Sequence, residues 1–289
     1  SFLKAFFEKG VNYFDNMKVF YTHFYGRMSD VLGIVNCGAY AEDVSVDEEQ
    51  YALENGWTKV ESAKNKETWY QSRQTRIKVS ELKYNKKIRK MTNPCKDIES
   101  EVKTLKDCNV EELRKVYSDY IKLKSDQYKE SDEIFSDFYT HDEFFDDLFI
   151  DPEYKRVIEY REGGELHAFV ICRVYEKANA MTSIQFCWDY HKPKIFLGKY
   201  SCIKEIEMCI DQGIEYVYLG GGYENMCIYK SMYQGFEWWT GSEWSKDKEA
   251  YKTLCSSDTN TKDIYDLGQL EEKYTGKFFF SPEEIKNRK

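Results

Sequence analysis

The stretch from Leu197 to Lys230 combines glycines with a predicted helix, a pairing that can bind an anion or a carbonyl oxygen. A predicted strand ends at Trp188-Asp189-Tyr190, and a turn containing Gly198 then leads into a helix over residues 200–213. The N-terminus of such a helix presents backbone N–H groups to a phosphate or a carbonyl oxygen. Gly220, Gly221 and Gly222 end the next predicted strand, where glycine permits a sharp turn and a close approach of a ligand. We interpret this pair of features as a candidate donor site, although a run of three glycines often does no more than turn the chain.

Positive charge is concentrated in one part of an otherwise acidic chain. The net charge is −9, and residues 131–153 hold nine Asp and Glu with no Lys or Arg. Residues 64–103, in contrast, hold twelve Lys and Arg against five Asp and Glu. A basic segment within an acidic protein is expected where one face meets nucleic-acid phosphates. A solvated charged surface has the same composition, so charge alone leaves both interpretations open.

The composition restricts the class of protein. With 289 residues, 42 % of them hydrophobic and 17 % aromatic, the chain can fold into one large or two small domains. No apolar run approaches the roughly 20 residues of a membrane-spanning helix. Nine cysteines occur without a Cys-x-x-Cys spacing, which predicts neither a disulfide framework nor a metal site. We therefore expect a cytoplasmic protein without a membrane partner.

Hydrophobic periodicity predicts a mixture of helices and strands. Residues 1–30 are predicted helical, and a short helix that Ser45 caps and Gly56 ends lies among strands and turns that follow. Asn109 is the predicted cap of a longer helix. Three strands then form an antiparallel meander, and strand, helix, strand, helix and strand alternate to the end of the pattern at Trp244.

This order of elements predicts an α+β protein with a GNAT-like acyltransferase fold, in which a splayed mixed sheet is flanked by helices. We divide the chain into a smaller N-terminal α+β lobe, residues 1–92, which carries the basic segment, and a transfer domain, residues 93–289. The splay of such a sheet coincides with the strand end and helix start at Gly198, so the candidate donor site falls at the splay.

The local sequence disfavours an acyl-coenzyme A donor. Users of that donor in this fold need an Arg/Gln-x-x-Gly-x-Gly/Ala loop, whose amides wrap the pyrophosphate, whereas IFLGKYS (residues 195–201) has a single glycine. An aminoacyl-tRNA donor needs no such loop, because its phosphates lie along an extended nucleic acid and are met by distributed Lys and Arg. No cofactor is predicted.

Three segments together resemble the arginyl-tRNA–protein transferases. They are SVDEEQYALENGWTKVE (residues 45–61), YQSRQTRIKVSELKYNKKIRKM (residues 70–91) and TSIQFCWDYHKPKIFLGKYSCIKEIE (residues 182–207). A Tyr-Lys pair follows the glycine-rich strand end in that family, as Tyr229-Lys230 does here. The resemblance implies transfer of an amino acid, by family precedent arginine, from charged tRNA to an amine through a GNAT-type domain.

The resemblance is carried over only where residues match. The matching positions are Gly56, Trp57, Arg76, Lys86, Lys87, Arg89, Lys90, Asp189, Leu197, Gly198, Tyr200, Ser201, Glu205, Tyr229 and Lys230. Family members usually have an N-terminal cysteine cluster that binds a metal or an iron–sulfur centre, and here only Cys37 stands in that region. Trp69 and Tyr70 replace the cysteine pair before the Arg-containing run. Recognition of a protein N-terminus as acceptor therefore does not follow from the resemblance.

Transfer from an activated ester requires positioning, a base and polarisation of the carbonyl. The candidate bases are Glu205 and Glu224, and the alternative for each is a solvated helix carboxylate. Tyr200 and Tyr229 are candidates to orient the ester or shuttle a proton, and they are equally consistent with core aromatics. Asp189 is the candidate partner of an arginine guanidinium.

The remaining candidates bind substrate or tRNA. Further aminoacyl-binding or substrate-binding positions are Trp57, Gly198, Ser201, Gly220 and Gly221. The positions expected to contact tRNA phosphates are Arg73, Arg76, Lys86, Lys87, Arg89, Lys90 and Lys230, with Trp69 and Tyr70 available to stack on an unpaired base.

The leading prediction is an aminoacyl-tRNA-dependent transferase that forms a peptide bond on an amine acceptor, either a protein N-terminus or a small molecule. Three alternatives remain: synthesis of a dipeptide or cyclodipeptide from the same donor, a tRNA or peptide binder without turnover, and an acyl-CoA N-acyltransferase.

Overall fold

The computed structural model describes residues 18–28, 31–61, 68–71, 73–128, 143–222, 225–241 and 243–260. Side chains are described in these ranges except at residues 18–28, 31–40, 125–128, 143–144 and 258–260, where the backbone alone is given.

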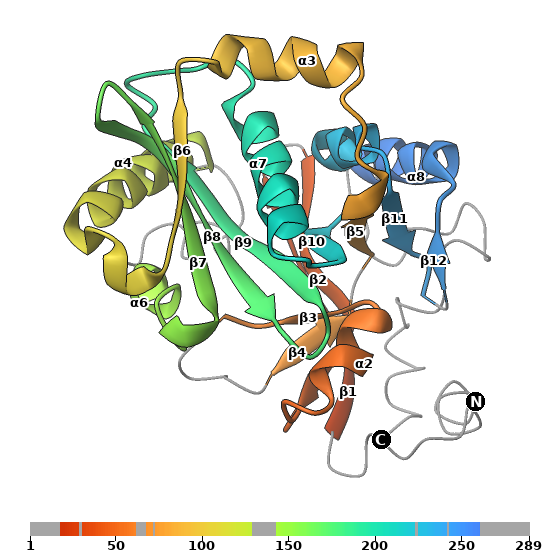
Figure 1. Cartoon of the computed structure of the whole chain (residues 1–289). Helices are drawn as coiled ribbons and strands as arrows, with labels where there is room; N and C mark the ends of the chain where they lie inside the picture. Colours follow the sequence, from red (N-terminus) through yellow and green to blue (C-terminus); the bar gives the residue numbers. More distant parts are fainter. Residues whose placement is uncertain are drawn as a thin grey trace.

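An eight-stranded mixed sheet forms the centre of the molecule (Figure 1). Its spatial order is β12-β11-β5-β10-β9-β8-β7-β6. The strands are β5 (Gln74–Lys78), β6 (Glu99–Lys103), β7 (Lys155–Glu162), β8 (Glu165–Tyr175), β9 (Ala180–Trp188), β10 (Tyr216–Gly221), β11 (Phe236–Trp239) and β12 (Trp244–Ser245). All neighbours are antiparallel except β9 and β10, which are parallel.

A second sheet has four strands in the order β1-β2-β4-β3. These are β1 (Lys18–Met28), β2 (Val31–Glu42), β3 (Trp57–Lys59) and β4 (Trp69–Gln71). The prediction of a helix through residue 30 is therefore wrong for residues 18–28, where the run KVFYTHFY is rich in the β-branched and aromatic residues that favour strands. Residues 1–17 of that predicted helix lie outside the described residues.

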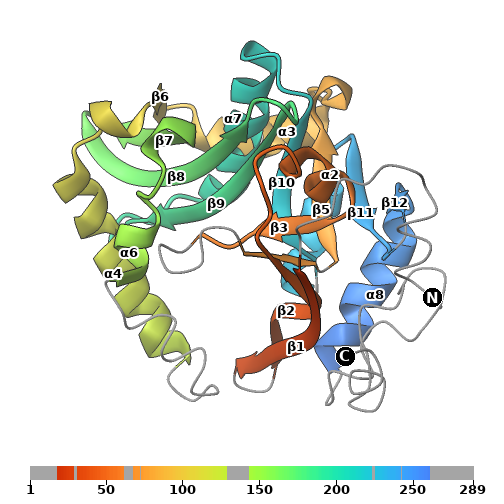
Figure 2. The ribbon, with the colours of Figure 1, turned by 90° about the horizontal axis from the view of Figure 1, so that it is seen from below.

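Helices cover both faces of the large sheet. They are α2 (Glu49–Glu54), α3 (Lys86–Thr92), α4 (Val110–Tyr128), α6 (Glu143–Asp147), α7 (Leu197–Asp211) and α8 (Lys248–Asn260). Short 3-10 helices are η1 (Val79–Glu81), η2 (Asn93–Cys95), η3 (Leu105–Asp107), η4 (Pro152–Tyr154) and η5 (Asn225–Met232). Seen from below, α4 and α6 lie on the opposite side of the sheet from α7 (Figure 2). No helix in the described part of the chain is both long enough and apolar enough to cross a membrane.

The central strands are buried on both faces. Val170 and Ile171 are adjacent on β8 and both fully buried, yet Val170 packs with α7 while Ile171 packs with α4. Successive side chains of a strand point to opposite faces, so a continuous apolar run such as FVIC can fill two cores at once. Because the sheet lies between two helical layers, α7 is held in a fixed position against β9 and β10.

The two parallel strands separate soon after they pair. Tyr216, Val217 and Tyr218 of β10 oppose Ala180, Met181 and Thr182 of β9, and no later residues of the two strands are paired. β9 continues to Trp188 on its own side, and α7 begins beyond the turn that follows. This splay, with a helix connecting the parted strands, confirms the predicted GNAT-like α+β fold. The division near residue 92 stays a prediction, and the large sheet takes strands from both sides of it.

Several local signals act as the sequence predicts. The Asn109 side chain accepts a hydrogen bond from the Glu112 N–H at the start of α4, and Gly56 has a left-handed φ of +77° just after α2. Gly163 and Gly164 both have positive φ in the tight turn between β7 and β8. Ser45 differs from the prediction, because its hydroxyl donates to the Glu48 carboxylate instead of accepting from the helix backbone.

Candidate functional site

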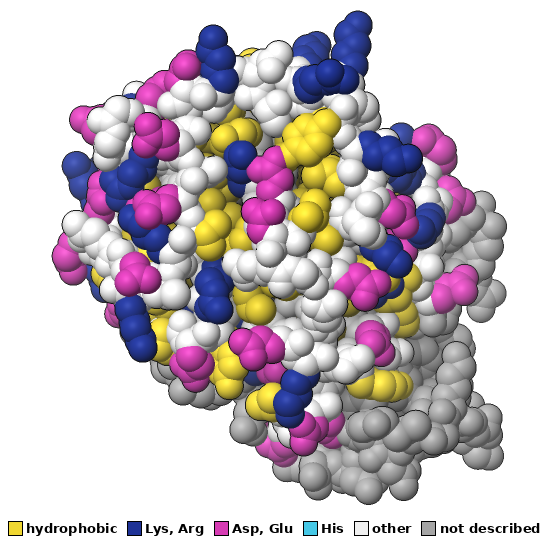
Figure 3. Space-filling model, in the orientation of Figure 1, with side chains coloured by type: hydrophobic (Ala, Val, Ile, Leu, Met, Phe, Trp, Pro, Cys, Tyr) yellow, Lys and Arg dark blue, Asp and Glu magenta, His cyan; other side chains and the backbone are white. Residues whose placement is uncertain are grey.

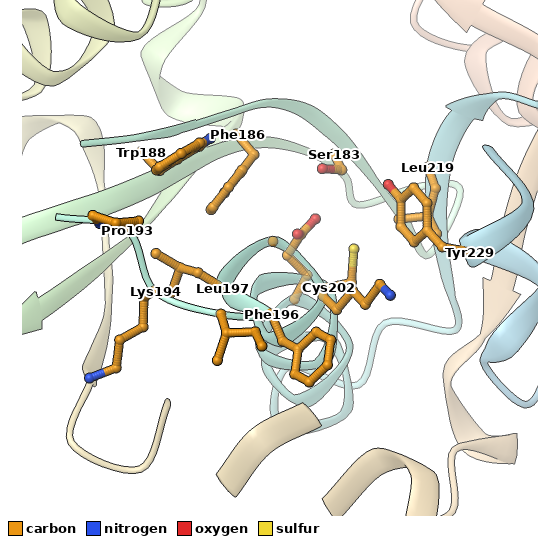
Figure 4. Close-up of a pocket in the computed structure, with 14 residues that line it drawn as sticks. Ser183, Phe186, Trp188, Pro193, Lys194, Phe196, Leu197, Cys202, Leu219 and Tyr229 are labelled. Atoms are coloured by element: carbon orange, nitrogen blue, oxygen red, sulfur yellow. The ribbon is translucent and has the colours of Figure 1, made fainter. Parts of the chain in front are cut away.

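A cavity of about 740 Å³ opens where β9 and β10 separate. Phe186 and Trp188 line it from β9, Leu219 lines it from β10 and Tyr229 lines it from η5 (Figure 4). The segment from Pro193 through the first turn of α7, together with Ser183, Cys202 and Glu205, forms the remaining wall. The cavity therefore lies at the splay, where the sequence predicts the donor site.

The start of α7 opens onto this cavity. Phe196 precedes the helix with a left-handed φ of +64°, a conformation that a bulky residue adopts only where its surroundings hold it. Leu197 donates its N–H to the Lys194 carbonyl at 3.3 Å, and Gly198 and Lys199 follow in the first helical turn. Backbone N–H groups in a first turn lack partners within the helix. Gly198 lines the cavity, as expected for a residue that presents this helix end to a ligand.

Glu205 brings a carboxyl group into the cavity wall from the third turn of α7. The residue is only 1 % exposed, and Ser201 Oγ donates to its Oε1 at 3.1 Å. The thiol of Cys172 lies 3.9 Å from its Oε2. Burial raises the pKa of Glu205 to about 7, although hydrogen bonds from Ser183 and Ser201 act in the opposite direction. A carboxyl group with a pKa near neutrality is suited to accept a proton during catalysis.

A buried tyrosine completes the support of Glu205. The Tyr160 hydroxyl on β7 donates to Ser201 Oγ at 2.9 Å, and both residues are buried. Ser201, expected to bind substrate, is thus engaged with Glu205 and Tyr160. Tyr160 carries no motif in the sequence, and its connection to Glu205 depends on the packing of β7 against α7. Phe186 and Trp188 alternate on the strand before the predicted donor turn, which is the signal by which these two cavity residues were detectable.

Tyr229 is placed in the cavity, whereas Tyr200 is not part of its wall. Tyr229 points its hydroxyl toward the cavity from η5 (Figure 4), and the residue is 36 % exposed. Tyr200 lies in the core on α7, where its hydroxyl is 3.4 Å from the Ile98 carbonyl and its ring meets the ring of Tyr160 edge to face. The predicted catalytic set is therefore brought together only for Glu205 and Tyr229.

The glycine-rich end of β10 is held by the protein itself. Lys230 is 7 % exposed, and its ammonium group donates to the carbonyls of Leu219 at 2.8 Å and Gly221 at 2.6 Å. The Gly220 carbonyl accepts from Thr75 Oγ1, and a Cβ atom at Gly222 would overlap the Tyr251 hydroxyl. Neighbouring side chains of the protein, and not a ligand, thus pack closely against these glycines. The Lys230 ammonium group is not available to a phosphate in this conformation.

Two of the arginines of the basic segment, Arg73 and Arg76, are also buried. Arg76 donates to Glu237 at 2.7 Å and to the Tyr218 hydroxyl, and its guanidinium lies between the rings of Tyr216 and Trp244. Arg73 is 2 % exposed and donates to the Gly222 carbonyl. Neither guanidinium faces the surface, so neither is available to a phosphate in this conformation.

Three other candidate positions lie away from the cavity wall or outside the described residues. Trp57 is buried in the small sheet among Trp69, Tyr175 and their neighbours. Asp189 lies in the turn after β9, where its Oδ1 accepts from the His191 N–H at 3.0 Å. Glu224, the second candidate base, lies outside the described residues.

The basic helix α3 is the exposed part of the predicted tRNA-binding segment. Its N-terminus is capped by Asn85, whose side chain accepts from two backbone N–H groups. Lys86, Lys87, Arg89 and Lys90 are all exposed on it, and dark blue side chains project from this edge in Figure 3, where Figure 1 places α3. Just after α3, the Cys95 thiol contacts the carbonyl of Ile195, which lines the cavity. The basic helix and the cavity are therefore neighbours.

Comparison with known proteins connects the described geometry to a family. Residues 112–240 match the family described as the C terminus of arginine-tRNA-protein transferase, and this part contains all the described residues that line the cavity but not α3. A comparison with curated protein sequences gives no match.

Solved structures of other proteins share parts of the fold. One is the C-terminal domain of a lysylphosphatidylglycerol synthetase from Agrobacterium fabrum, with 14 % identity, a TM-score of 0.39, and 52 % of this chain and 46 % of that chain covered. A second is L-PGS from Bacillus licheniformis, with 11 % identity, a TM-score of 0.40, and 80 % of this chain and 62 % of that chain covered. A third is the PaiA N-acetyltransferase from Thermoplasma acidophilum in complex with coenzyme A, with 14 % identity, a TM-score of 0.28, and 40 % of this chain and 75 % of that chain covered.

The first two of these proteins are considerably longer than the part that this chain matches, since it spans 46 % and 62 % of their lengths. The family match does not depend on them, because it is a match of sequence over a continuous stretch. Through residues 112–240, the chain is similar to the C terminus of arginine-tRNA-protein transferase.

Proposed function

We propose that this protein is an aminoacyl-tRNA-dependent transferase, which moves an amino acid from charged tRNA to an amine and forms a peptide bond. One observation carries the proposal: a buried carboxyl group, Glu205, faces a cavity at the splay of the sheet, within the part of the chain that matches the family. The family description names arginine as the amino acid. The basic helix beside the cavity supports a nucleic-acid donor.

Because an aminoacyl ester is already activated, the site needs only to position the reactants, accept a proton and polarise the carbonyl. The acceptor nitrogen attacks the ester carbonyl carbon, and the bond from that carbon to the ribose oxygen breaks. Glu205 takes the proton that the nitrogen loses, and the departing ribose oxygen gains a proton. The first turn of α7 would polarise the carbonyl through its backbone N–H groups. General-base assistance of this kind contributes on the order of 10² to 10⁴ in rate.

The body of the tRNA would be met by α3. Its four exposed cations can neutralise phosphates without reading a sequence, and such contacts position a nucleic acid rather than select it. Because η2 contacts the loop at Ile195, a tRNA held along α3 would present its 3′ end to the cavity.

A transfer assay tests the proposal. Total tRNA charged with labelled amino acids is incubated with the protein, separately in the presence of peptides with free N-termini and of small amines, and the product masses are determined. Label on a peptide identifies a protein N-terminus as the acceptor, and label on a small product identifies a small-molecule amine. Loss of label from tRNA no faster than spontaneous hydrolysis, with every acceptor, would contradict the proposal.

A further inference from the structure

The cavity walls differ from those expected for an arginyl group. We propose that the amino acid taken from tRNA by this chain has a large apolar or aromatic side chain. This inference rests on the proposed function, because it concerns the donor of the same transfer reaction. It changes the identity of the donor's amino acid and leaves the reaction itself as proposed.

The described lining is dominated by rings and branched apolar groups. Two faces of the cavity are built from β9 and from the start of α7, and the third comes from β10 and η5. The apolar side chains of the lining include Phe186, Trp188, Phe196, Leu197, Leu219 and Tyr229. A volume of about 740 Å³ lies within the range of roughly 300–1,000 Å³ that small-molecule sites occupy. It is large enough for an aromatic aminoacyl group together with part of the ribose.

The one carboxyl group among the described lining residues is poorly placed to bind a guanidinium. Glu205 Oε1 already accepts from Ser201, and its Oε2 faces the thiol of Cys172 within the core. A guanidinium is bound best by two carboxylate oxygens in a shared plane. Because burial raises the pKa of Glu205 to about 7, the carboxyl also carries only part of a negative charge at neutral pH.

The cations that line the cavity oppose a third positive charge. Lys194 and Lys199 both line it. Lys194 forms an ion pair at 2.7 Å with Glu162, a residue that does not line the cavity. Lys199 Nζ lies 5.3 Å from the centre of the Phe196 ring. A guanidinium in the cavity would therefore meet a lysine of like charge and would compete with it for the aromatic face.

The residue expected to select arginine does not contribute to the cavity. Asp189 follows β9 directly, but its carboxylate accepts a hydrogen bond from His191 in the turn, and it is not among the described lining residues. An arginyl side chain would thus lose its water and gain no free carboxylate from the described wall, a cost that an apolar side chain avoids.

A panel of individually charged tRNAs tests the inference with the wild-type protein. Phenylalanyl-, leucyl-, methionyl- and tryptophanyl-tRNA are compared with arginyl- and lysyl-tRNA under the same acceptor conditions, and kcat/KM is measured for each donor. We expect at least one apolar donor to exceed arginyl-tRNA on the order of 100-fold. A preference for arginyl-tRNA would overturn this inference and leave the proposed function intact, whereas no transfer from any donor would remove the proposed function itself.

A carboxyl group introduced into the wall provides a second test. Leu219→Glu should raise the use of arginyl-tRNA relative to the best apolar donor by roughly tenfold or more, because it supplies the missing partner for a guanidinium. The matched control is Ile210→Glu, which places the same charge at an exposed position of α7 outside the cavity lining. An unchanged ratio in a folded Leu219→Glu protein, as in the control, would show that this wall does not contact the aminoacyl side chain.

Discussion

At the scale of single residues, Glu205 combines burial with a position in the cavity wall. An ordinary carboxyl group is excluded from protein interiors because its charged form loses its hydration. Here hydrogen bonds from Ser201 and Ser183 offset part of that cost, and the pKa settles at about 7. The raised pKa that makes Glu205 a candidate base therefore also means that its ionisation destabilises the folded protein above neutral pH.

The stability consequence can be measured without any substrate. Because the folded-state pKa of Glu205 is raised from 4.5 to about 7, the native state retains a proton that the unfolded state releases. The contribution of Glu205 to the free energy of unfolding is complete below about pH 4.5 and is lost as the pH rises through 7. The loss amounts to at most roughly 3 kcal/mol. Glu205→Gln should therefore gain stability relative to wild type between pH 5 and pH 8 in urea unfolding. An unchanged difference between these two pH values would contradict the raised pKa.

The rate of catalysis should rise with pH, whereas the stability contribution of Glu205 falls with pH. As the carboxylate form is the base, kcat/KM should rise with pH and level off above an apparent pKa of about 7. Glu205→Gln should reduce kcat on the order of 10²-fold or more while tRNA affinity stays at the wild-type value. A wild-type rate in this variant would exclude Glu205 as the base, and a loss confined to tRNA affinity would assign it a binding role instead.

At the scale of elements, α3 gathers the exposed cations on one short helix beside the cavity. The helix is fixed by its Asn85 cap and by the burial of Ile88 and Met91, so its four cations project from a rigid support. Arg73 and Arg76, which precede it in the same basic segment, are instead buried in the sheet. A single run of positive charge in the sequence thus separates into a structural part and an exposed part.

The exposed part can be tested by charge reversal. Lys86→Glu combined with Lys87→Glu should weaken tRNA binding by 10-fold or more, on the order of the loss expected when phosphate contacts are replaced by repulsion, and should reduce the salt dependence of the remaining affinity. Binding is measured by fluorescence anisotropy at several salt concentrations. The matched control is Lys115→Glu combined with Lys122→Glu, two exposed lysines of α4. Equal losses in the two double variants would show a general charge effect and contradict a footprint on α3.

At the scale of the whole molecule, a buried group of charges joins the segment after β3 to the large sheet. Glu61 accepts from Arg173 Nε at 2.7 Å and from Nη2 at 2.9 Å, and it also pairs with Lys155. Lys155 is fully buried, and burial lowers its pKa to about 8 despite the carboxylate beside it. Two cations of the large sheet therefore share one carboxylate from the N-terminal part of the chain, and Arg173 also pairs with Asp151 at 3.0 Å.

Removal of that carboxylate should destabilise the protein strongly. Glu61→Gln leaves Lys155 and Arg173 buried with reduced compensation, and the breaking of such a buried pair costs about 3–5 kcal/mol. The control is Glu81→Gln, which removes an exposed pair with Lys246 and should cost less than about 1 kcal/mol. Denaturant unfolding of both variants at pH 7 gives the comparison. Similar midpoints for the two would refute a structural role for the buried charges.

The sequence predicts what depends on near neighbours along the chain. Asn109, Gly163 and Gly164 act through contacts a few residues away, and the alternation of strand and helix defines the splay together with the start of α7. The burial of Arg76 was not predictable in the same way, because its partner Glu237 comes from a distant strand. The positions of Tyr160 and Asp189 relative to the cavity likewise depend on how strands pack against α7, which local patterns do not encode.

The most direct test of the central claim is a competition between two classes of donor. The protein is given a pool of charged tRNA labelled in the amino acid and acetyl-coenzyme A labelled in the acetyl group, with a mixture of peptide and small-molecule amines as acceptors. We predict that label from tRNA alone enters the product, with the mass increase of one aminoacyl residue. Label entering from acetyl-coenzyme A, with none from tRNA, would contradict the account and identify an acyl-coenzyme A transferase.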